Sequence, residues 1–89
     1  MNPETQVYLN GKIVPSSEAH IAIYDASVVL GATLTDMERT FGHQLFRLDE
    51  HLDRFFRSCK YARIDPPISK DQTRKIVEEL VNHNSQFID

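Results

Sequence analysis

The apolar and polar positions divide the chain into a strand-like first half and a helical second half. In the first half, the segment VYLNGKIV places Asn10 and Gly11 between two β-prone runs, the strongest short-range signal for a two-residue hairpin turn. Residues 19–25 (AHIAIYD) then alternate Ala, Ile and Ile with His, Ala and Tyr. This alternation predicts a half-buried strand.

The stretch over residues 26–48 has no clean hydrophobic period. A Gly-His pair at 42–43 predicts a turn that leads into a short strand over residues 44–46. Upstream of that turn, two faces alternate and neither is cleanly apolar. One face carries Leu34, Asp36 and Glu38, and the other carries Thr33, Thr35, Met37 and Arg39.

The second half opens with an amphipathic helix that we predict over residues 49–61. Asp49 is the expected N-cap residue, and Pro66 and Pro67 forbid any continuation of the helix. Apolar residues recur at i, i+3, i+4 and i+7, which predicts a stripe that holds this helix to the sheet. The stripe consists of Leu52, Phe55, Phe56 and Cys59.

A second stripe on the same helix carries polar side chains. At about 100° per residue, His51, Arg54 and Ser58 line up away from the apolar stripe. A guanidinium is planar and permanently charged, so it suits the oxygens of a phosphate. The residues alone leave two interpretations open: this face is solvated, or it binds an anion.

A further helix follows the prolines. The segment SKDQ, from Ser69 to Gln72, matches a capping box, and we predict that the helix ends at residues 82–84. Its buried stripe is expected to hold Ile76, Val77, Leu80 and Val81. The last residues, SQFID over 85–89, are expected to begin another strand, so the chain looks cut rather than finished.

These elements and the composition predict one small α+β domain over residues 1–89, with a mostly antiparallel sheet and two helices on one side. A formal net charge of −3 argues against a nucleic-acid partner. No apolar run approaches the roughly 18 residues that cross a bilayer, and the N-terminus does not resemble a secretory signal. We therefore expect neither a nucleic-acid nor a membrane partner.

The cysteine and histidine content indicates a cytoplasmic protein without a metal site. Cys59 is the only cysteine, so no internal disulfide is possible. Because Cys59 lies on the apolar stripe, we predict a buried structural thiol rather than a nucleophile. No pair of Cys or His residues has the spacing of zinc ligands.

The order of these features resembles the N-terminal domain of the class IV, fold-type IV enzymes that use pyridoxal phosphate. They are the branched-chain aminotransferases, the D-amino-acid aminotransferases and the aminodeoxychorismate lyases. The specific part is FRLDEHLDRFFRS, close to the family's F-x-L-x-x-H-L-x-R-L-x-x-S. Three further features precede it in the family's order. They are the Asn-Gly hairpin, an I-x-x-x-D strand end at 21–25, and a glycine at position 31 that opens a long strand.

The resemblance implies a role for the polar stripe. Arg54 falls on the arginine that binds the cofactor phosphate in this family. His51 falls on the histidine one turn before it, where a structural hydrogen bond that holds the helix and the arginine is expected rather than general-base catalysis. Ser58 either packs against the same surface or faces water.

Departures from the family pattern concern the substrate side. The chain has GATLTD over residues 31–36 where the family commonly has G-D-G-V-F/Y-E, so Thr35 replaces an aromatic that lines the substrate pocket in relatives. Arg39 falls where related enzymes carry an arginine at the end of the long strand. Two roles are open for Arg39: contact with the substrate, or an ion pair with Asp36 or Glu38.

The resemblance also implies that the reacting centre lies outside this chain. In the family, a lysine of the C-terminal domain forms a Schiff base with the cofactor aldehyde. None of Lys12, Lys60, Lys70 and Lys75 matches that position, so no catalytic residue is assigned here. We expect the N-terminal part of a homodimeric aminotransferase that moves an amino group between an amino acid and a 2-oxo acid. The alternatives are part of an aminodeoxychorismate-type lyase, or a stand-alone dimerisation or ligand-binding module.

Overall fold

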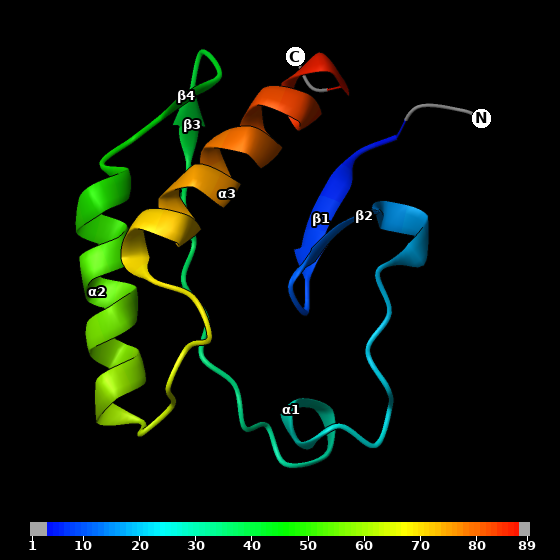
Figure 1. Cartoon of the computed structure of the whole chain (residues 1–89), viewed down its shortest axis with the longest axis vertical. Coiled ribbons are helices and arrows are strands. Elements are labelled where there is room, and N and C mark those ends of the chain that lie inside the picture. The colour runs from blue at the N-terminus through cyan, green and yellow to red at the C-terminus, as the bar shows by residue number, and fades with distance from the viewer. Residues whose placement is uncertain (1–3, 88–89) are drawn as a thin grey trace.

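The computed structural model describes residues 4–87 and arranges them around one central helix, α3 (Figure 1). Helix α2 lies on one side of α3 and a β-hairpin lies on the other, while the connecting segment swings along the bottom of the view. In chain order the elements are β1 (Gln6–Leu9), β2 (Lys12–Pro15), the 3-10 turn η1 (Ser16–Glu18), α1 (Ala26–Val29), β3 (Thr40–Phe41), β4 (Gln44–Leu45), α2 (Leu48–Tyr61), α3 (Lys70–Asn84) and the 3-10 turn η2 (Ser85–Phe87).

The N-terminal hairpin confirms the prediction from its Asn-Gly turn. Strands β1 and β2 pair antiparallel, with Tyr8 opposite Ile13. The turn requires positive φ at both central positions, and Asn10 (φ 50°) and Gly11 (φ 88°) supply it. Asparagine and glycine are the residues that tolerate this backbone best, so the sequence determines the register locally.

The expected α+β class is confirmed, but the strands form two separate hairpins rather than one sheet. Strands β3 and β4 pair only with each other, with Thr40 opposite Leu45. The predicted turn between them is present, since Gly42 and His43 both have positive φ (57° and 65°). The predicted strand over 44–46 is one residue shorter and ends at Leu45.

The strand predicted over residues 19–25 and the long strand predicted after residue 31 are wrong. A strand needs a neighbour for its backbone hydrogen bonds, and within residues 4–87 neither stretch has one. Ile23 and Tyr24 are each 84% exposed. The chain turns there instead: Asp25 accepts from the backbone N–H of Ser27 at 2.9 Å and begins the short helix α1, which the sequence did not predict.

Helix α2 ends at Tyr61 as predicted, but its N-cap lies two residues before the expected Asp49. Its N-cap residue is Arg47 in the left-handed conformation, and Asp49 lies inside the first turn. Leu52 (6% exposed) and Cys59 (2% exposed) are the buried residues of residues 4–87, which confirms the predicted buried thiol.

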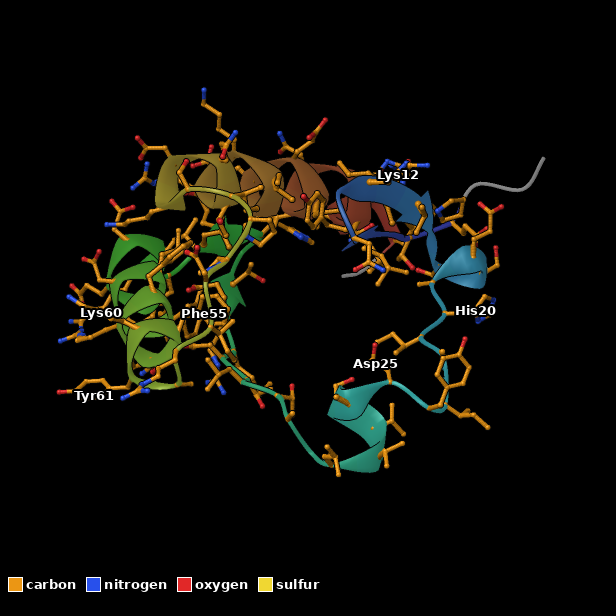
Figure 2. The ribbon with its side chains drawn as sticks, turned by 60° about the horizontal axis from the view of Figure 1, so that its bottom comes forward. Lys12, His20, Asp25, Phe55, Lys60 and Tyr61 are labelled. Atoms are coloured by element: carbon orange, nitrogen blue, oxygen red, sulfur yellow. The ribbon has the colours of Figure 1, made fainter. Side chains whose placement is uncertain are left out.

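The apolar stripe of α2 packs toward α3 rather than onto a sheet. Leu52 and Phe55 line a small hollow together with Thr73 and Val77 of α3. Figure 2 shows Phe55 on the inner side of α2, whereas Tyr61 points away from the rest of the molecule.

Helix α3 joins α2 to the first hairpin. Its C-terminal end holds β1, because the Asn84 amide accepts from the backbone N–H of Gln6 at 2.7 Å and donates to its carbonyl at 3.0 Å. His83 Nε2 donates to the carbonyl of Glu4 at 2.9 Å. These contacts replace the sheet pairing that β1 lacks on that edge.

The strand predicted to begin after α3 is wrong for residues 85–87. The helix closes at Asn84, as expected, but residues 85–87 form the 3-10 turn η2 instead of a strand. The Ser85 hydroxyl donates back to the Val81 carbonyl at 2.5 Å, which continues the helical course. The rest of that predicted strand, residues 88–89, lies outside the described residues.

The capping box at the start of α3 is confirmed and gives a stability prediction. The Ser69 hydroxyl accepts from the backbone N–H of Gln72, whose side chain accepts from the backbone N–H of Ser69 at 2.8 Å. Replacing Ser69 with Ala should lower the free energy of unfolding by about 1 kcal/mol, measured by urea denaturation followed by circular dichroism. Lys75→Ala, at an exposed position of the same helix, should change it by less than about 0.5 kcal/mol. Equal losses for both variants would contradict a specific contribution of the cap.

Candidate anion-binding site

An ion pair with two hydrogen bonds joins Arg54 of α2 to Asp36. The guanidinium donates from Nε to Asp36 Oδ2 at 3.1 Å and from Nη2 to Oδ1 at 2.6 Å. Two parallel charge-assisted bonds fix the plane of the guanidinium as well as its position. The contact spans 18 residues and fastens the segment before β3 to α2.

The segment that carries Asp36 keeps a strand-like alternation although, within residues 4–87, it pairs with no strand. Residues 31–39 have no regular secondary structure, and their side chains alternate between a half-buried and an exposed face. The sequence predicted these two faces correctly. Leu34, Asp36 and Glu38 are half-buried, whereas Thr35, Met37 and Arg39 are exposed.

His51, one turn before Arg54, completes the cluster. Arg54 Nη2 lies 2.9 Å from His51 Nδ1. Because an arginine only donates, Nδ1 is assigned as the acceptor and the ring proton is placed on Nε2. The 3.4 Å approach of Nδ1 to Asp36 Oδ1 is then not a hydrogen bond. This geometry agrees with the structural role expected for His51.

Glu38 joins the same segment to Phe46, two residues before α2 begins. Its Oε1 accepts from the backbone N–H of Phe46 at 3.0 Å, and that N–H also approaches the Arg39 carbonyl at 3.1 Å. The other oxygen, Oε2, is buried without a hydrogen-bond partner among the described residues. His51 Nε2, which carries the ring proton, faces it at 3.8 Å.

The ion pair changes the electrostatics of both partners. The hydrogen bonds from Arg54 hold the pKa of Asp36 below its ordinary value, although partial burial of the carboxylate acts in the opposite direction. Asp36 in turn raises the pKa of Arg54. At neutral pH, Asp36 is therefore ionised and Arg54 is charged.

Arg54 remains available to solvent despite this ion pair. Its side chain is 57% exposed, against 16% for Asp36. Nε and Nη2 are occupied, but Nη1 makes no hydrogen bond to any other residue within 4–87. Arg54 lines a surface hollow of about 490 Å³ together with Arg47 and Arg57. Glu50 and Asp53 line the same hollow, so its charge is mixed.

The remaining predicted site residues lie apart from this cluster. Thr35 and Arg39 are exposed on the opposite face of their segment from Asp36. Of the two roles left open for Arg39, the ion pair with Asp36 or Glu38 is not formed within the described residues. Those two carboxylates face α2 instead. Ser58 is half-buried, and its hydroxyl bonds to no other residue between 4 and 87.

The described part of the chain holds no group of three or more His, Cys, Asp or Glu side chains arranged for a metal ion. Over the same residues, no helix combines the length and the apolar character needed to cross a membrane.

Comparison with known proteins places the chain in a family. The profile of the family described as amino-transferase class IV matches residues 33–88, which include the Arg54 cluster. A protein of Methanocaldococcus jannaschii with a provisional branched-chain-amino-acid aminotransferase name is 31% identical over 90% of this chain and 28% of its own length. D-alanine aminotransferase of Staphylococcus haemolyticus is 28% identical over 91% of this chain and 29% of its own length.

The chain therefore belongs to the class IV aminotransferase family. Members of this family depend on pyridoxal phosphate in general and act on amino acids and 2-oxo acids. The chain spans less than a third of the length of the relatives named above, since it covers 28% and 29% of them.

The helical spacing correctly placed Arg54 and His51 side by side on α2, but it gave no indication of their contacts with Asp36 and Glu38. The alternation of the segment placed both carboxylates on one face, which was a usable signal. Nothing in the spacing indicated that this face meets α2, 15 to 18 residues further along the chain.

The lowered pKa of Asp36 gives a pH prediction. A carboxylate with a lowered folded-state pKa contributes stability that is fully present above its ordinary value of 3.8 and is lost as the pH falls through the folded-state value. Asp36→Asn should therefore be less stable than the wild type at neutral pH, and the difference should close as the solution is acidified below 3.8. Urea denaturation of both proteins across that range measures it. A difference that stays constant in acid would show that the ion pair is not its source.

Proposed function

We propose that this chain is the N-terminal part of a pyridoxal-phosphate-dependent class IV aminotransferase, and that Arg54 anchors the cofactor phosphate. The observation that carries the proposal is the arrangement of Arg54: the protein fixes two of its nitrogens, Nη1 bonds to no other residue within 4–87, and the side chain is 57% exposed. A guanidinium held in this way presents a permanent charge and N–H donors to an incoming phosphate.

The donor set fits a phosphate monoester better than a bare carboxylate. Arg54, Arg47 and Arg57 line one hollow and offer several N–H donors there, beside the carboxylates of Glu50 and Asp53. A phosphate monoester carries about −1.5 to −2 charges near neutral pH and three acceptor oxygens. An arginine whose guanidinium is fixed in this way would both attract the phosphate and set its orientation.

The chain's own residues bind and orient rather than react. The cofactor, when bound, supplies an aldehyde and an electron-withdrawing ring for amino-group transfer. Arg54 would hold its phosphate end, and His51 and Asp36 would keep the guanidinium in place. None of the four lysines, all within the described residues, lines the hollow at Arg54. The lysine that reacts with the aldehyde therefore belongs, in this proposal, to the part of the relatives that this chain does not span.

Substrate contact is proposed for Thr35 and Arg39. Both are exposed on the face of their segment that turns away from α2. Arg39, which has no ion-pair partner among residues 4–87, offers a charge for a substrate carboxylate. The names of the relatives favour amino-group transfer between an amino acid and a 2-oxo acid over elimination. We also propose that the complete protein forms a homodimer and is located in the cytoplasm.

Removing the anchor tests the cofactor role. Pyridoxine 5′-phosphate, which carries the phosphate but no aldehyde, should bind the wild-type chain more tightly than pyridoxine does. Arg54→Gln should weaken its binding roughly ten- to a hundredfold, because a bond between charged groups is lost. Titration calorimetry or NMR shifts measure this, and Lys75→Gln removes the same charge from an exposed position of α3 as a control. Equal affinities for wild type and Arg54→Gln would refute the proposed anchor.

The absence of a suitable lysine gives a second test. The chain mixed with pyridoxal phosphate and borohydride should show only low, scattered labelling over Lys12, Lys60, Lys70 and Lys75, because none lines the hollow at Arg54. Peptide mass spectrometry after reduction measures the distribution. Stoichiometric labelling of one lysine would mean that this chain contains its own reacting amine.

A further inference from the structure

Asp36 holds the Arg54 guanidinium from one side, and this contact suggests a role for Asp36. Asp36 contributes both carboxylate oxygens, to Nε at 3.1 Å and to Nη2 at 2.6 Å. His51 Nδ1 accepts from the same Nη2 at 2.9 Å. The remaining nitrogen, Nη1, is the one that bonds to no other described residue and is left for a ligand.

Asp36 is itself anchored, so it does not simply follow the arginine. It is 16% exposed, and its segment is fixed two residues later by the bond from the Phe46 backbone N–H to Glu38 at 3.0 Å. The arginine is the more exposed partner of the pair. The more buried carboxylate is therefore the partner that fixes the plane of the more exposed guanidinium.

From this geometry we propose that Asp36 is a positioning residue for Arg54: it holds the guanidinium so that the Nη1 edge meets the phosphate. The inference rests on the proposed function of Arg54 as a phosphate anchor. A long arginine side chain loses rotamer freedom when it binds a ligand, and a partner that has already ordered it reduces that loss. Asp36 and the phosphate occupy different edges of the guanidinium at the same time.

The opposite expectation follows from charge alone, which makes the proposal testable. Asp36 is negative and lies beside the anion site, so its removal should strengthen phosphate binding if simple repulsion dominates. If positioning dominates, its removal should weaken binding although a repulsive charge has gone. The two accounts predict opposite signs for one substitution.

The affinity for pyridoxine 5′-phosphate should be measured for the wild type, Asp36→Asn and Glu50→Gln. Glu50 is the matched control, because it lines the hollow at Arg54 and makes no bond to that arginine. Glu50→Gln should bind as tightly as the wild type or more tightly. Asp36→Asn should bind about two- to tenfold more weakly, which corresponds to the ordering of one long side chain. An affinity of Asp36→Asn equal to or above that of the wild type overturns the proposal.

A measurement on the unaltered chain covers the case in which Asp36→Asn does not fold. The Nε–H proton of Arg54, held by Asp36, should give a protected NMR signal, and this signal should persist when the chain is saturated with pyridoxine 5′-phosphate. Loss of the signal on binding would show that the ligand displaces Asp36, and would overturn the positioning role.

The two proposals fail in different ways. If Arg54→Gln binds the ester as well as the wild type does, the anchor itself is wrong. If Arg54→Gln loses affinity while Asp36→Asn keeps or gains it, the anchor holds and only the role of Asp36 is wrong.

Discussion

The bidentate bond between Asp36 and Arg54 is the interaction on which the arrangement of the site depends. Within residues 4–87, the segment over 31–39 pairs with no strand, and its one bond to the β3–β4 hairpin backbone joins the Phe46 N–H to the Arg39 carbonyl. Side-chain contacts therefore fix its position, from Asp36 to α2 and from Glu38 to the backbone of Phe46 just before α2. An exposed ion pair alone contributes little to stability, but a bidentate geometry supported by neighbouring bonds specifies an orientation well.

Helix α3 gives the rest of the molecule its order by similar means. Its start is fixed by a local capping box, and its end holds the edge of β1 through Asn84 and His83. Between them, its apolar side packs toward α2. Helix α3 therefore contacts both α2 and the first hairpin, which are not joined by a sheet. In this open arrangement, Leu52 and Cys59 are the fully buried apolar residues among residues 4–87.

The sequence predicted correctly those features that depend on residues close together in the chain. The Asn10-Gly11 turn, the capping box at Ser69 and the apolar stripe ending in Cys59 each depend on residues a few positions apart, and each is confirmed. The strand over 19–25 failed because its pattern required a partner strand that residues 4–87 do not supply. For the candidate site, helical spacing predicted the polar stripe that carries Arg54. It could not predict the contact with Asp36, because the position of that segment beside α2 depends on tertiary packing.

The alternation of residues 34–39 assigns different chemistry to the two faces of one short segment. The half-buried face meets α2 and orders Arg54, while the exposed face carries Thr35 and Arg39. A segment built in this way can link a phosphate anchor on one side to a substrate contact on the other without any side chain serving both. Because successive side chains of an extended chain point in opposite directions, a shift of one residue would exchange the two faces. The Asp36–Arg54 bond therefore fixes the register of the proposed substrate face as well as the orientation of the anchor.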